Sequence, residues 1–396
     1  MSLKTELMAK LDAAQPEMIK IRRHLHKYPE LSFHEEKTAA YIKAFYQNLD
    51  CQITNYGEGY GFAVEISGGQ PGPKLALRAD FDALAVQEDN DLPFKSVNPG
   101  VMHACGHDGH TAYLMVLAKA LIELKDRLHG SIRVIHQNAE EVSPGGAKGM
   151  VADGVLDGVD NVIGLHVMTS MPTGSIGYHL NETQTGRANF TITFTGKGGH
   201  ASMPHLSNDA IVSGSYFVTA LQTVVSRRID PFDTASVTIG SFDGNGSYNA
   251  IKESVTLKGD VRVMKETTRK TVRSQIEQIA HGIEAMFGVR AEIDYDDNYP
   301  VLVNDPQLTT SVMETIKAAK IPELTQVFDC GPQDPSEDFA YFAQHTPSCF
   351  FYVGCQTSDG ANHPHHSPDF MLNEDALIIA AKSAGAAVLG YLDQSK

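Results

Sequence analysis

KLALRADFDAL, residues 74–84, is a short apolar strand pattern followed at once by two aspartates. Similar apolar segments stand at 131–137 (SIRVIHQ) and 161–167 (NVIGLHV), with helical patterns at 37–49 and 109–125. Short runs rich in Val, Ile and Leu are typical of strands buried on both faces of a sheet. Because such strands alternate with helices, the sequence predicts an α/β domain with a mainly parallel sheet flanked by helices.

A different pattern begins at the polar segment NETQTGR, residues 181–187, which we interpret as a linker. A strand, a helix, two strands, a second helix and a last strand follow, ending near Tyr295. This βαββαβ order is typical of a ferredoxin-like domain. The α/β pattern then resumes. The sequence therefore predicts a catalytic domain at 1–184 and 299–396, interrupted by an inserted domain at 185–298.

Composition restricts the possible partners of the chain. Lysine and arginine total 32 against 48 aspartates and glutamates, a formal net charge of −16. Nucleic acid and anionic membrane surfaces both require a basic face, so we expect neither as a partner. Apolar residues make up 42% of the chain and charged residues 20%, which favours an ordered core over disorder.

Cysteine usage and the N-terminus favour a cytoplasmic protein. The five cysteines are odd in number and irregular in spacing, which does not suit a disulfide framework. The first 26 residues form an amphipathic helical pattern without a signal-peptide core. We found no continuous apolar run of about 18 residues, so we expect no membrane span.

Potential metal ligands gather where the predicted strands end. In open α/β sheets, sites form outside the carboxyl ends of the strands, so these groups are expected to converge. The groups are Asp80 and Asp82; Cys105, His107, Asp108 and His110 in HACGHDGH; Glu140 and Glu141; His166; and His363, His365 and His366 in NHPHHSP.

Each of these groups has a structural interpretation when it is taken alone. Cys105 could be a small buried hydrophobic residue, and His166 a hydrogen-bonded core histidine. Adjacent glutamates are usually solvated surface residues. Three histidines, a thiol and a carboxylate within eight residues offer nothing to apolar packing, however. Their occurrence together with the other groups therefore favours metal binding.

The donor types suit two divalent cations. Thiolate, imidazole and carboxylate ligands fit Zn²⁺, and nitrogen-rich sites also accept Mn²⁺ or Co²⁺. Paired metals can polarise a carbonyl and lower the pKa of water, which is what hydrolysis of an amide requires. One of the glutamates Glu140 and Glu141 could then act as general base while the other binds metal.

Eight segments together resemble the M20 metallopeptidase family, in particular its aminoacylase, hippurate hydrolase and auxin-conjugate hydrolase branch. They occur in the order of that branch and cover nearly the whole chain. PSEDF and LAVQE depart slightly from its pattern, but neither departure removes a ligand. The segments are RRHLHKYPELSFHE (22–35), LALRADFDAL (75–84), HACGHDGHTAYLM (103–115), QNAEE (137–141), GLHV (164–167), GKGGHASMPH (196–205), PSEDFAYF (335–342) and HHSPDF (365–370).

The resemblance implies a role for each matching residue of the metal centre. Glu140 is similar to the general base, and Asp80 to a carboxylate that orients a ligand. Cys105 is similar to a ligand that bridges both metals. The remaining ligands implied are His107, Glu141, His166 and His366, with His365 as the alternative to His366.

The resemblance also implies roles for the inserted domain, which in this family forms a dimer and binds substrate. His200 in GGHAS is similar to a histidine that polarises the scissile carbonyl, often from the partner subunit. Asn249 and Arg262 match positions that hold the carboxylate of the substrate. The structural interpretations are a turn for GGHAS, a loop asparagine and a surface arginine.

These observations predict hydrolysis of the amide bond of a small N-acylated amino acid, with an N-acetyl, N-benzoyl or similar group, by a homodimer. Two alternatives stay open. A dipeptidase of the same fold would need to recognise a free α-amine. A non-catalytic dimeric binding protein would keep the fold without turnover, although the presence of Glu140 favours an enzyme.

Overall fold

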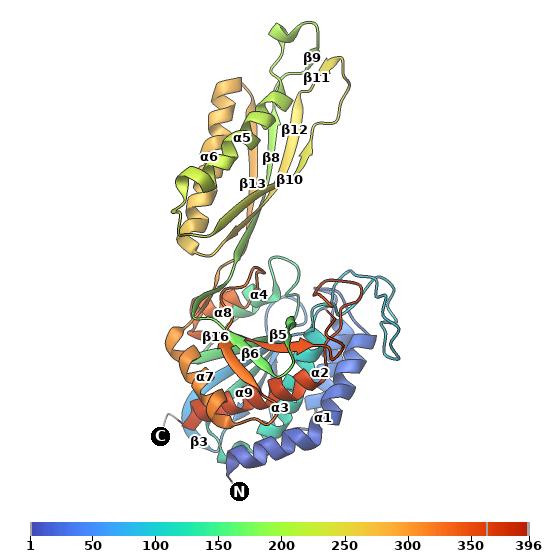
Figure 1. Ribbon diagram of the computed structural model, residues 1–396, viewed down its shortest axis with the longest axis vertical. Coiled ribbons are helices and arrows are strands. Elements are labelled where there is room, and N and C mark those ends of the chain that lie inside the picture. Colours follow the sequence, from blue (N-terminus) through green and yellow to red (C-terminus); the bar gives the residue numbers. More distant parts are fainter. Residues whose placement is uncertain (1, 362, 394–396) are drawn as a thin grey trace. The chain divides into compact units, whose positions relative to one another are not determined.

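The computed structural model describes residues 2–361 and 363–393, and the chain divides into two compact units (Figure 1). The first unit comprises residues up to Thr183, Val303–Pro332 and everything from Asp338 onward. The second comprises Gln184–Leu302 together with the short segment Gln333–Glu337, which the sequence pattern did not indicate.

The first unit contains an eight-stranded sheet in the order β1-β2-β4-β3-β5-β16-β6-β15. Its four central strands run parallel, whereas β1, β2 and β6 join through antiparallel pairings. The expected α/β class is therefore confirmed. The strands are β1 (Gln52–Asn55), β2 (Phe62–Ser67), β3 (Gln70–Asp80), β4 (His129–Gln137), β5 (Asn161–Pro172), β6 (Ser175–Tyr178), β15 (Gln326–Asp329) and β16 (Ser348–Gln356).

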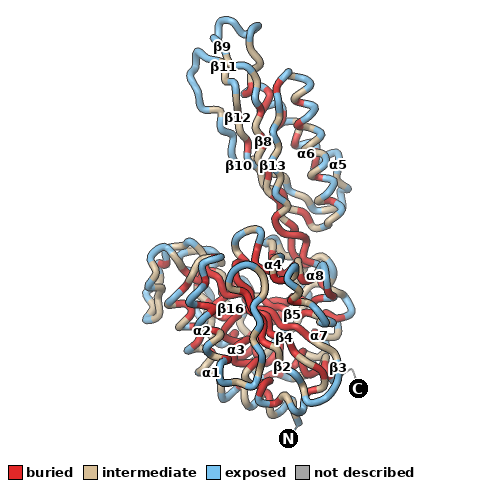
Figure 2. Tube along the Cα trace, turned by 180° about the vertical axis from the view of Figure 1, so that it is seen from behind, coloured by how far each residue is buried: buried red, intermediate tan, exposed pale blue. Residues whose placement is uncertain are grey.

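Helices surround this sheet. Helices α3 (His107–Glu123) and α9 (Asp375–Asp393) pack directly on the central strands, and α1 (Leu3–Lys27) packs on both of these helices (Figure 1). They form one continuous apolar core, and the buried colouring in Figure 2 follows the sheet strands. The helices are α1 (Leu3–Lys27), α2 (Glu36–Tyr46), α3 (His107–Glu123), α4 (Gly146–Ala152), α7 (Pro306–Ala319), α8 (Ala340–His345) and α9 (Asp375–Asp393).

Helix α9 is long and apolar enough to cross a membrane by length and composition alone, a feature that the sequence analysis overlooked. Most of its residues are buried inside the first unit, however, and the helix packs on α1, α3 and α7. Its Lys382 is 2% exposed and forms ion pairs with Asp12 and Glu323. A helix that is apolar all round and covered by protein is typical of a domain core.

The second unit has the expected βαββαβ order. Its sheet runs β10-β12-β8-β13 with every neighbouring pair antiparallel, and α5 and α6 lie on one face (Figure 1). A separate core of aromatic and aliphatic side chains fills the space between helices and sheet. The elements are β8 (Gly186–Thr195), α5 (Ala210–Arg228), β10 (Ala235–Asp243), β12 (Ser254–Val263), α6 (Glu266–Phe287) and β13 (Arg290–Tyr299).

Two details differ from the sequence interpretation. NETQTGR is not an irregular linker: Asn181–Gln184 forms strand β7, which pairs with β14 (Leu302–Asn304), and β8 starts at Gly186. The second unit also has a small two-stranded ribbon of β9 (Gly199–His200) and β11 (Ala250–Ile251). Strands this short carry too little apolar alternation to be recognised from sequence.

Candidate active site

The predicted ligands meet at the carboxyl ends of β3, β4 and β5. Asp80, the last residue of β3, lies opposite Gln137, the last residue of β4. Glu140 and Glu141 therefore follow β4 at the level where Asp82 follows β3. His166 belongs to β5 on the other side of β3. Parallel pairing in register thus brings distant parts of the chain to one edge of the sheet.

The turn that begins α3 places two of the ligands. Gly106 has φ of +95°, in the left-handed region that favours glycine. A Cβ atom at this position would lie 2.4 Å from Cγ2 of Val167, the residue after His166. Glycine therefore lets the segment pack against β5, so that the ligand atoms of Cys105, His107 and His166 all lie within 4.8 Å of one another.

A second group of possible ligand atoms shares the same thiol. Cys105, Glu141 and His366 also have ligand atoms within 4.8 Å of one another. The Nε2 atom of His366 lies 3.4 Å from Oε1 of Glu141, and the Cys105 sulfur lies 3.4 Å from Nε2 of His166. Since Cys105 belongs to both groups, its position suits a ligand shared by two cations.

Two buried atoms at this centre make the strongest case for cation binding. Nε2 of His107 and Oε1 of Glu141 make no hydrogen bond of good geometry among the described residues, although they lie 3.8 Å from each other and Oε1 of Glu141 lies 3.4 Å from Nε2 of His366. Burial by itself lowers the pKa of His107, but the carboxylates of Asp80, Asp82 and Glu141 raise it to about 10. The surroundings therefore stabilise positive charge, and the donor set fits divalent cations held by thiolate, imidazole and carboxylate.

Hydrogen bonds at the outer nitrogens orient two imidazoles. His166 donates from Nδ1 to the carbonyl oxygen of Val167 at 2.6 Å, which leaves its Nε2 directed at Cys105. The Nδ1 atom of His107 lies 3.1 Å from both the carbonyl oxygen and Oδ1 of Asp82. Such bonds fix the tautomer that leaves Nε2 available to a metal.

The two aspartates of RADFDAL have different contacts. Asp82 contacts the predicted ligand His107, whereas Asp80 lies 2.7 Å from Nδ1 of His110 and 2.7 Å from Arg78. Burial alone raises the pKa of Asp80, but Arg78 and the two histidines hold it well below its usual range. The direct hydrogen bond to a predicted ligand is therefore made by Asp82, to which the sequence analysis gave no such role.

The two candidate terminal histidines occupy different environments. The ring of His365 is half-buried, 5.3 Å from His166 and 5.1 Å from Phe370 between centroids. Its Nε2 faces the N–H of Thr169 at 3.4 Å. His366 adopts φ of +64°, and its own N–H donates to Ala104. Among these histidines, His366 is therefore the one whose ligand atom joins Cys105 and Glu141.

The predicted substrate-binding residues of the second unit fall into two places. His200 pairs with Ala250 across the small ribbon, and the N–H of Ala201 donates to the carbonyl oxygen of Asn249. Arg262 instead lies opposite Arg187 near the start of β8. From Arg187 to Thr195, where β8 ends before the ribbon strand β9, there are eight residue steps, which correspond to about 26 Å. The unit therefore brings His200 and Asn249 together but not Arg262.

Three further hydrogen bonds orient the side chains of His200 and Arg262. Nδ1 of His200 lies 2.7 Å from the hydroxyl of Ser202 and accepts from the Ser202 N–H at 3.2 Å. The proton of neutral His200 then resides on Nε2, which can donate to a carbonyl oxygen. Arg262 donates from Nε to Asp260 at 2.8 Å, so part of its charge is already compensated.

Sequence reasoning missed the residues that support this centre from RRHLHKYPELSFHE. Arg22 and His26 both contact the buried carboxylate of Asp108, at 2.8 and 2.9 Å. Ser32 donates to Asp82, and Glu35 accepts from the N–H of Ala139. The available signal was the concentration of polar residues in this segment, which does not precede a strand. It could have indicated contacts with the predicted centre.

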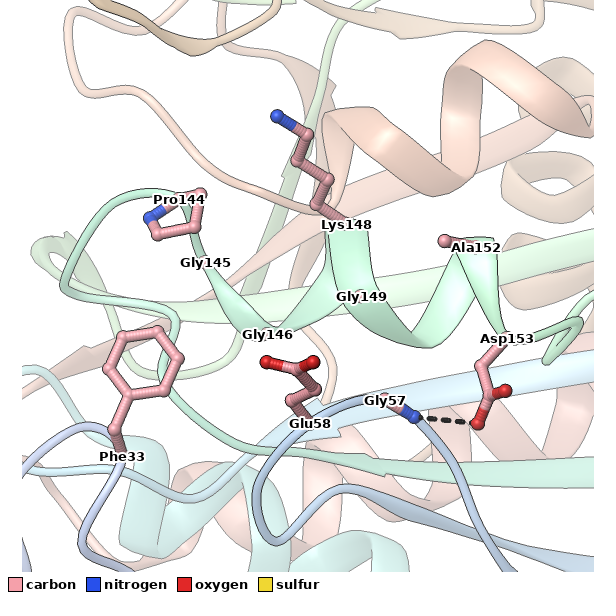
Figure 3. Close-up of a pocket in the computed structure, with 10 residues that line it drawn as sticks. All are labelled: Phe33, Gly57, Glu58, Pro144, Gly145, Gly146, Lys148, Gly149, Ala152 and Asp153. Atoms are coloured by element: carbon pink, nitrogen blue, oxygen red, sulfur yellow. Dashed lines mark hydrogen bonds between the residues drawn. The ribbon is translucent and has the colours of Figure 1, made fainter.

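A pocket of about 580 Å³ is lined by residues between Pro144 and Asp153, which follow the two glutamates in the chain, and by Phe33, Gly57 and Glu58 (Figure 3). Phe33 and Pro144 line one end, and Asp153 lies at the other end, where it accepts from the N–H of Gly57. Lys148 extends away from Glu58 in this view. The pocket offers both apolar and charged lining, of the size that suits a small ligand.

This fold and this constellation define a metal-dependent hydrolase. Residues 76–389 match the model of peptidase family M20/M25/M40, and the chain belongs to this family. It is an amidohydrolase of the M20 type, as the resemblance predicted.

Known proteins similar to the chain agree with this assignment. An N-acyl-L-amino acid amidohydrolase of Geobacillus stearothermophilus is 42% identical over 301 residues, which are 76% of this chain and 81% of that protein. A crystal structure described as an aminohydrolase from methicillin resistant Staphylococcus aureus is 52% identical, with a TM-score of 0.95, covering 98% of this chain and 100% of the other. The Bacillus subtilis YXEP protein, a dinuclear metal binding peptidase, is 30% identical with a TM-score of 0.83, covering 96% and 99%.

Proposed function

We propose that the protein hydrolyses the amide bond of small N-acyl amino acids at a two-cation centre formed by Cys105, His107, Glu141, His166 and His366. The observation that carries the proposal is the pair of ligand groups that share Cys105, with buried atoms on His107 and Glu141 that make no hydrogen bond among the described residues. The similarity to an N-acyl-L-amino acid amidohydrolase supports the choice of substrate class.

In this proposal Glu140 is the general base. It is 7% exposed, and its carboxylate lies with the imidazole of His107 and the carboxylate of Glu141 in one group of possible ligand atoms. Glu140 takes a proton from the attacking water and delivers it to the leaving nitrogen as the C–N bond breaks. The products are the free amino acid and a carboxylate. When bound, Zn²⁺, Mn²⁺ or Co²⁺ would polarise the scissile carbonyl and acidify water at this site.

The second unit supplies substrate contacts in the same proposal. His200 donates from Nε2 to the carbonyl oxygen, and Asn249 and Arg262 hold the substrate carboxylate. The separation of about 26 Å along β8 prevents His200 and Arg262 of one chain from reaching a small substrate together. We therefore propose a homodimer in which one subunit provides His200 and Asn249 and the other provides Arg262. A cytoplasmic location belongs to the same proposal.

Metal content and substrate preference test the proposal together. Protein purified without chelator should contain about two divalent cations per chain. A panel of N-acetyl and N-benzoyl amino acids should be hydrolysed with higher kcat/KM than unblocked dipeptides. A preference for dipeptides would indicate that the protein is a dipeptidase of the same fold and not an N-acyl amino acid hydrolase. Metal binding without turnover on either panel would favour the binding protein.

The substitution Glu140→Gln tests the general base without removing any of the proposed metal ligands. This variant should retain its cations and lose hydrolysis by about 10²-fold or more, because the amide cannot accept the proton. Turnover at the wild-type rate would contradict the assignment of Glu140.

A further inference from the structure

The backbone turns sharply at Ala139, the residue immediately before Glu140. Ala139 is fully buried and has φ of +51°, an uncommon conformation for a residue with a Cβ atom. Its carbonyl oxygen accepts from the N–H of Gly146, which closes the loop that carries both glutamates. The direction of the Glu140 side chain therefore depends on a backbone conformation that the surrounding structure has to maintain.

The side chain that holds this turn is Glu35. It is 0% exposed and stands at the start of α2, yet its carboxyl group does not cap that helix. Its Oε1 instead accepts from the N–H of Ala139 at 2.8 Å. The carbonyl oxygen of Glu35 accepts from Ala39 in the first turn of α2, so the residue is anchored to a helix.

A second carboxylate holds the other side of Glu140. Oδ2 of Asp82 accepts from the N–H of Glu141 at 3.0 Å and from the hydroxyl of Ser32 at 2.7 Å. The amides on both sides of Glu140 are thus bound by buried carboxyl groups, one from Glu35 and one from Asp82. Both contacts lead back to the segment Ser32–Glu35, which lies about a hundred residues earlier in the chain.

We propose that Glu35 is a positioning residue for hydrolysis: its carboxyl group fixes the turn at Ala139 and so aims the carboxylate of Glu140 at the attacking water. This inference rests on the proposed function, in which Glu140 is the general base. Catalysis tolerates little misplacement of a reacting group, so loss of the contact should act on turnover more than on binding.

The chemistry of Glu35 identifies the variant that should replace it. Burial first, and then the charge of Asp82, raise the pKa of Glu35 to about 8. At neutral pH the group is then mostly the uncharged acid, and its function at Ala139 is that of a hydrogen-bond acceptor. Glutamine has the same length and a carbonyl oxygen that accepts the same bond.

The test compares Glu35→Ala, Glu35→Gln and Glu30→Ala, with Glu140→Gln as the inactive reference. Glu30→Ala is the matched control, because Glu30 lies in the same segment and accepts from Thr38 N–H at 2.7 Å and from its hydroxyl at 2.9 Å. Measured quantities are kcat and KM on an N-acyl amino acid, bound metal per chain and the midpoint of thermal unfolding. Glu35→Ala should lower kcat about tenfold or more with KM and metal content unchanged. Glu35→Gln should restore most of kcat, and Glu30→Ala should leave it unchanged.

Ala139→Gly provides a second route that leaves Glu35 in place. Glycine adopts positive φ without strain but frees the turn, so kcat should fall while the unfolding midpoint stays equal or rises. A general loss of structure cannot produce that combination. This variant also keeps the test decisive if Glu35→Ala does not fold.

Three results would overturn the positioning role. One is a kcat of Glu35→Ala close to wild type while Glu140→Gln is inactive. The proposed function would then stand, and the positioning role of Glu35 would fail. Another is an equal loss of kcat in Glu35→Ala and Glu30→Ala, which would indicate a general effect of the segment. The third is wild-type turnover by Glu140→Gln, which would remove the general base and the positioning role with it.

Discussion

Gly106→Ala should damage the proposed metal centre through a single methyl group. Its φ of +95° imposes a backbone penalty on alanine of about 1–2 kcal/mol. The new Cβ would also lie 2.4 Å from Cγ2 of Val167, so that β5 or the segment Cys105–His107 has to move. Overpacking of this kind typically costs about 1–3 kcal/mol more. The sum is a destabilisation of about 2–5 kcal/mol. The strain would arise where the segment that carries the predicted ligands Cys105 and His107 packs against the strand that carries His166.

Gly158→Ala is the matched control. Gly158 also has positive φ, at +72°, but no atom lies within 4 Å of the place that a Cβ atom would occupy. The free energy of unfolding of Gly158→Ala should fall only by the backbone penalty of about 1–2 kcal/mol, and the variant should keep its metal and its activity. Urea unfolding of the metal-free variants measures both losses, and metal titration followed by kcat/KM measures the site. Equal destabilisation and equal metal affinity in the two variants would refute the argument that close packing of Gly106 on β5 places the ligands.

Three other predictions follow from the structure. Cys105→Ala should lose bound metal and activity together, because the thiol belongs to both ligand groups, and a fully loaded, active variant would contradict the shared role. Mixed His200→Ala and Glu140→Gln subunits should regain part of the activity that each lacks alone, whereas no recovery after demonstrated subunit exchange would exclude action across the dimer. Because the pKa of Glu35 is raised to about 8 in the folded protein, the stability contributed by its neutral form is fully present below pH 4.5 and is lost as pH rises toward 8. Metal-free wild type should therefore lose stability relative to Glu35→Gln over that range, by at most about 1.4 kcal/mol per pH unit, and a pH-independent difference in urea unfolding would contradict the shifted pKa.

The hydrogen bonds around Asp80 and Asp82 include contacts that the sequence did not indicate. Both aspartates follow the same strand, and the resemblance assigned the orienting role to Asp80. In the structure Asp80 hydrogen-bonds with Arg78 and His110 and lies 3.7 Å from Nε2 of His107, whereas Asp82 hydrogen-bonds with Nδ1 of His107 and with the N–H of Glu141. The orienting role of Asp80 stays a prediction. Which of two nearby carboxylates contacts a ligand depends on how the chain turns after β3, and no local pattern encodes that turn.

The fold class, the βαββαβ insertion and the position of possible ligands at the strand ends could all be predicted from the amino-acid sequence. These follow from local periodicity and from the rule that parallel strands share one carboxyl edge. The sequence ranked His366 before His365 as the terminal ligand, and the fold places the ligand atom of His366 with those of Cys105 and Glu141. The contact of Glu35 with Ala139 came from the fold and not from any sequence pattern. These contacts join residues about a hundred or more positions apart, so their geometry is set by packing of the whole unit rather than by local preference.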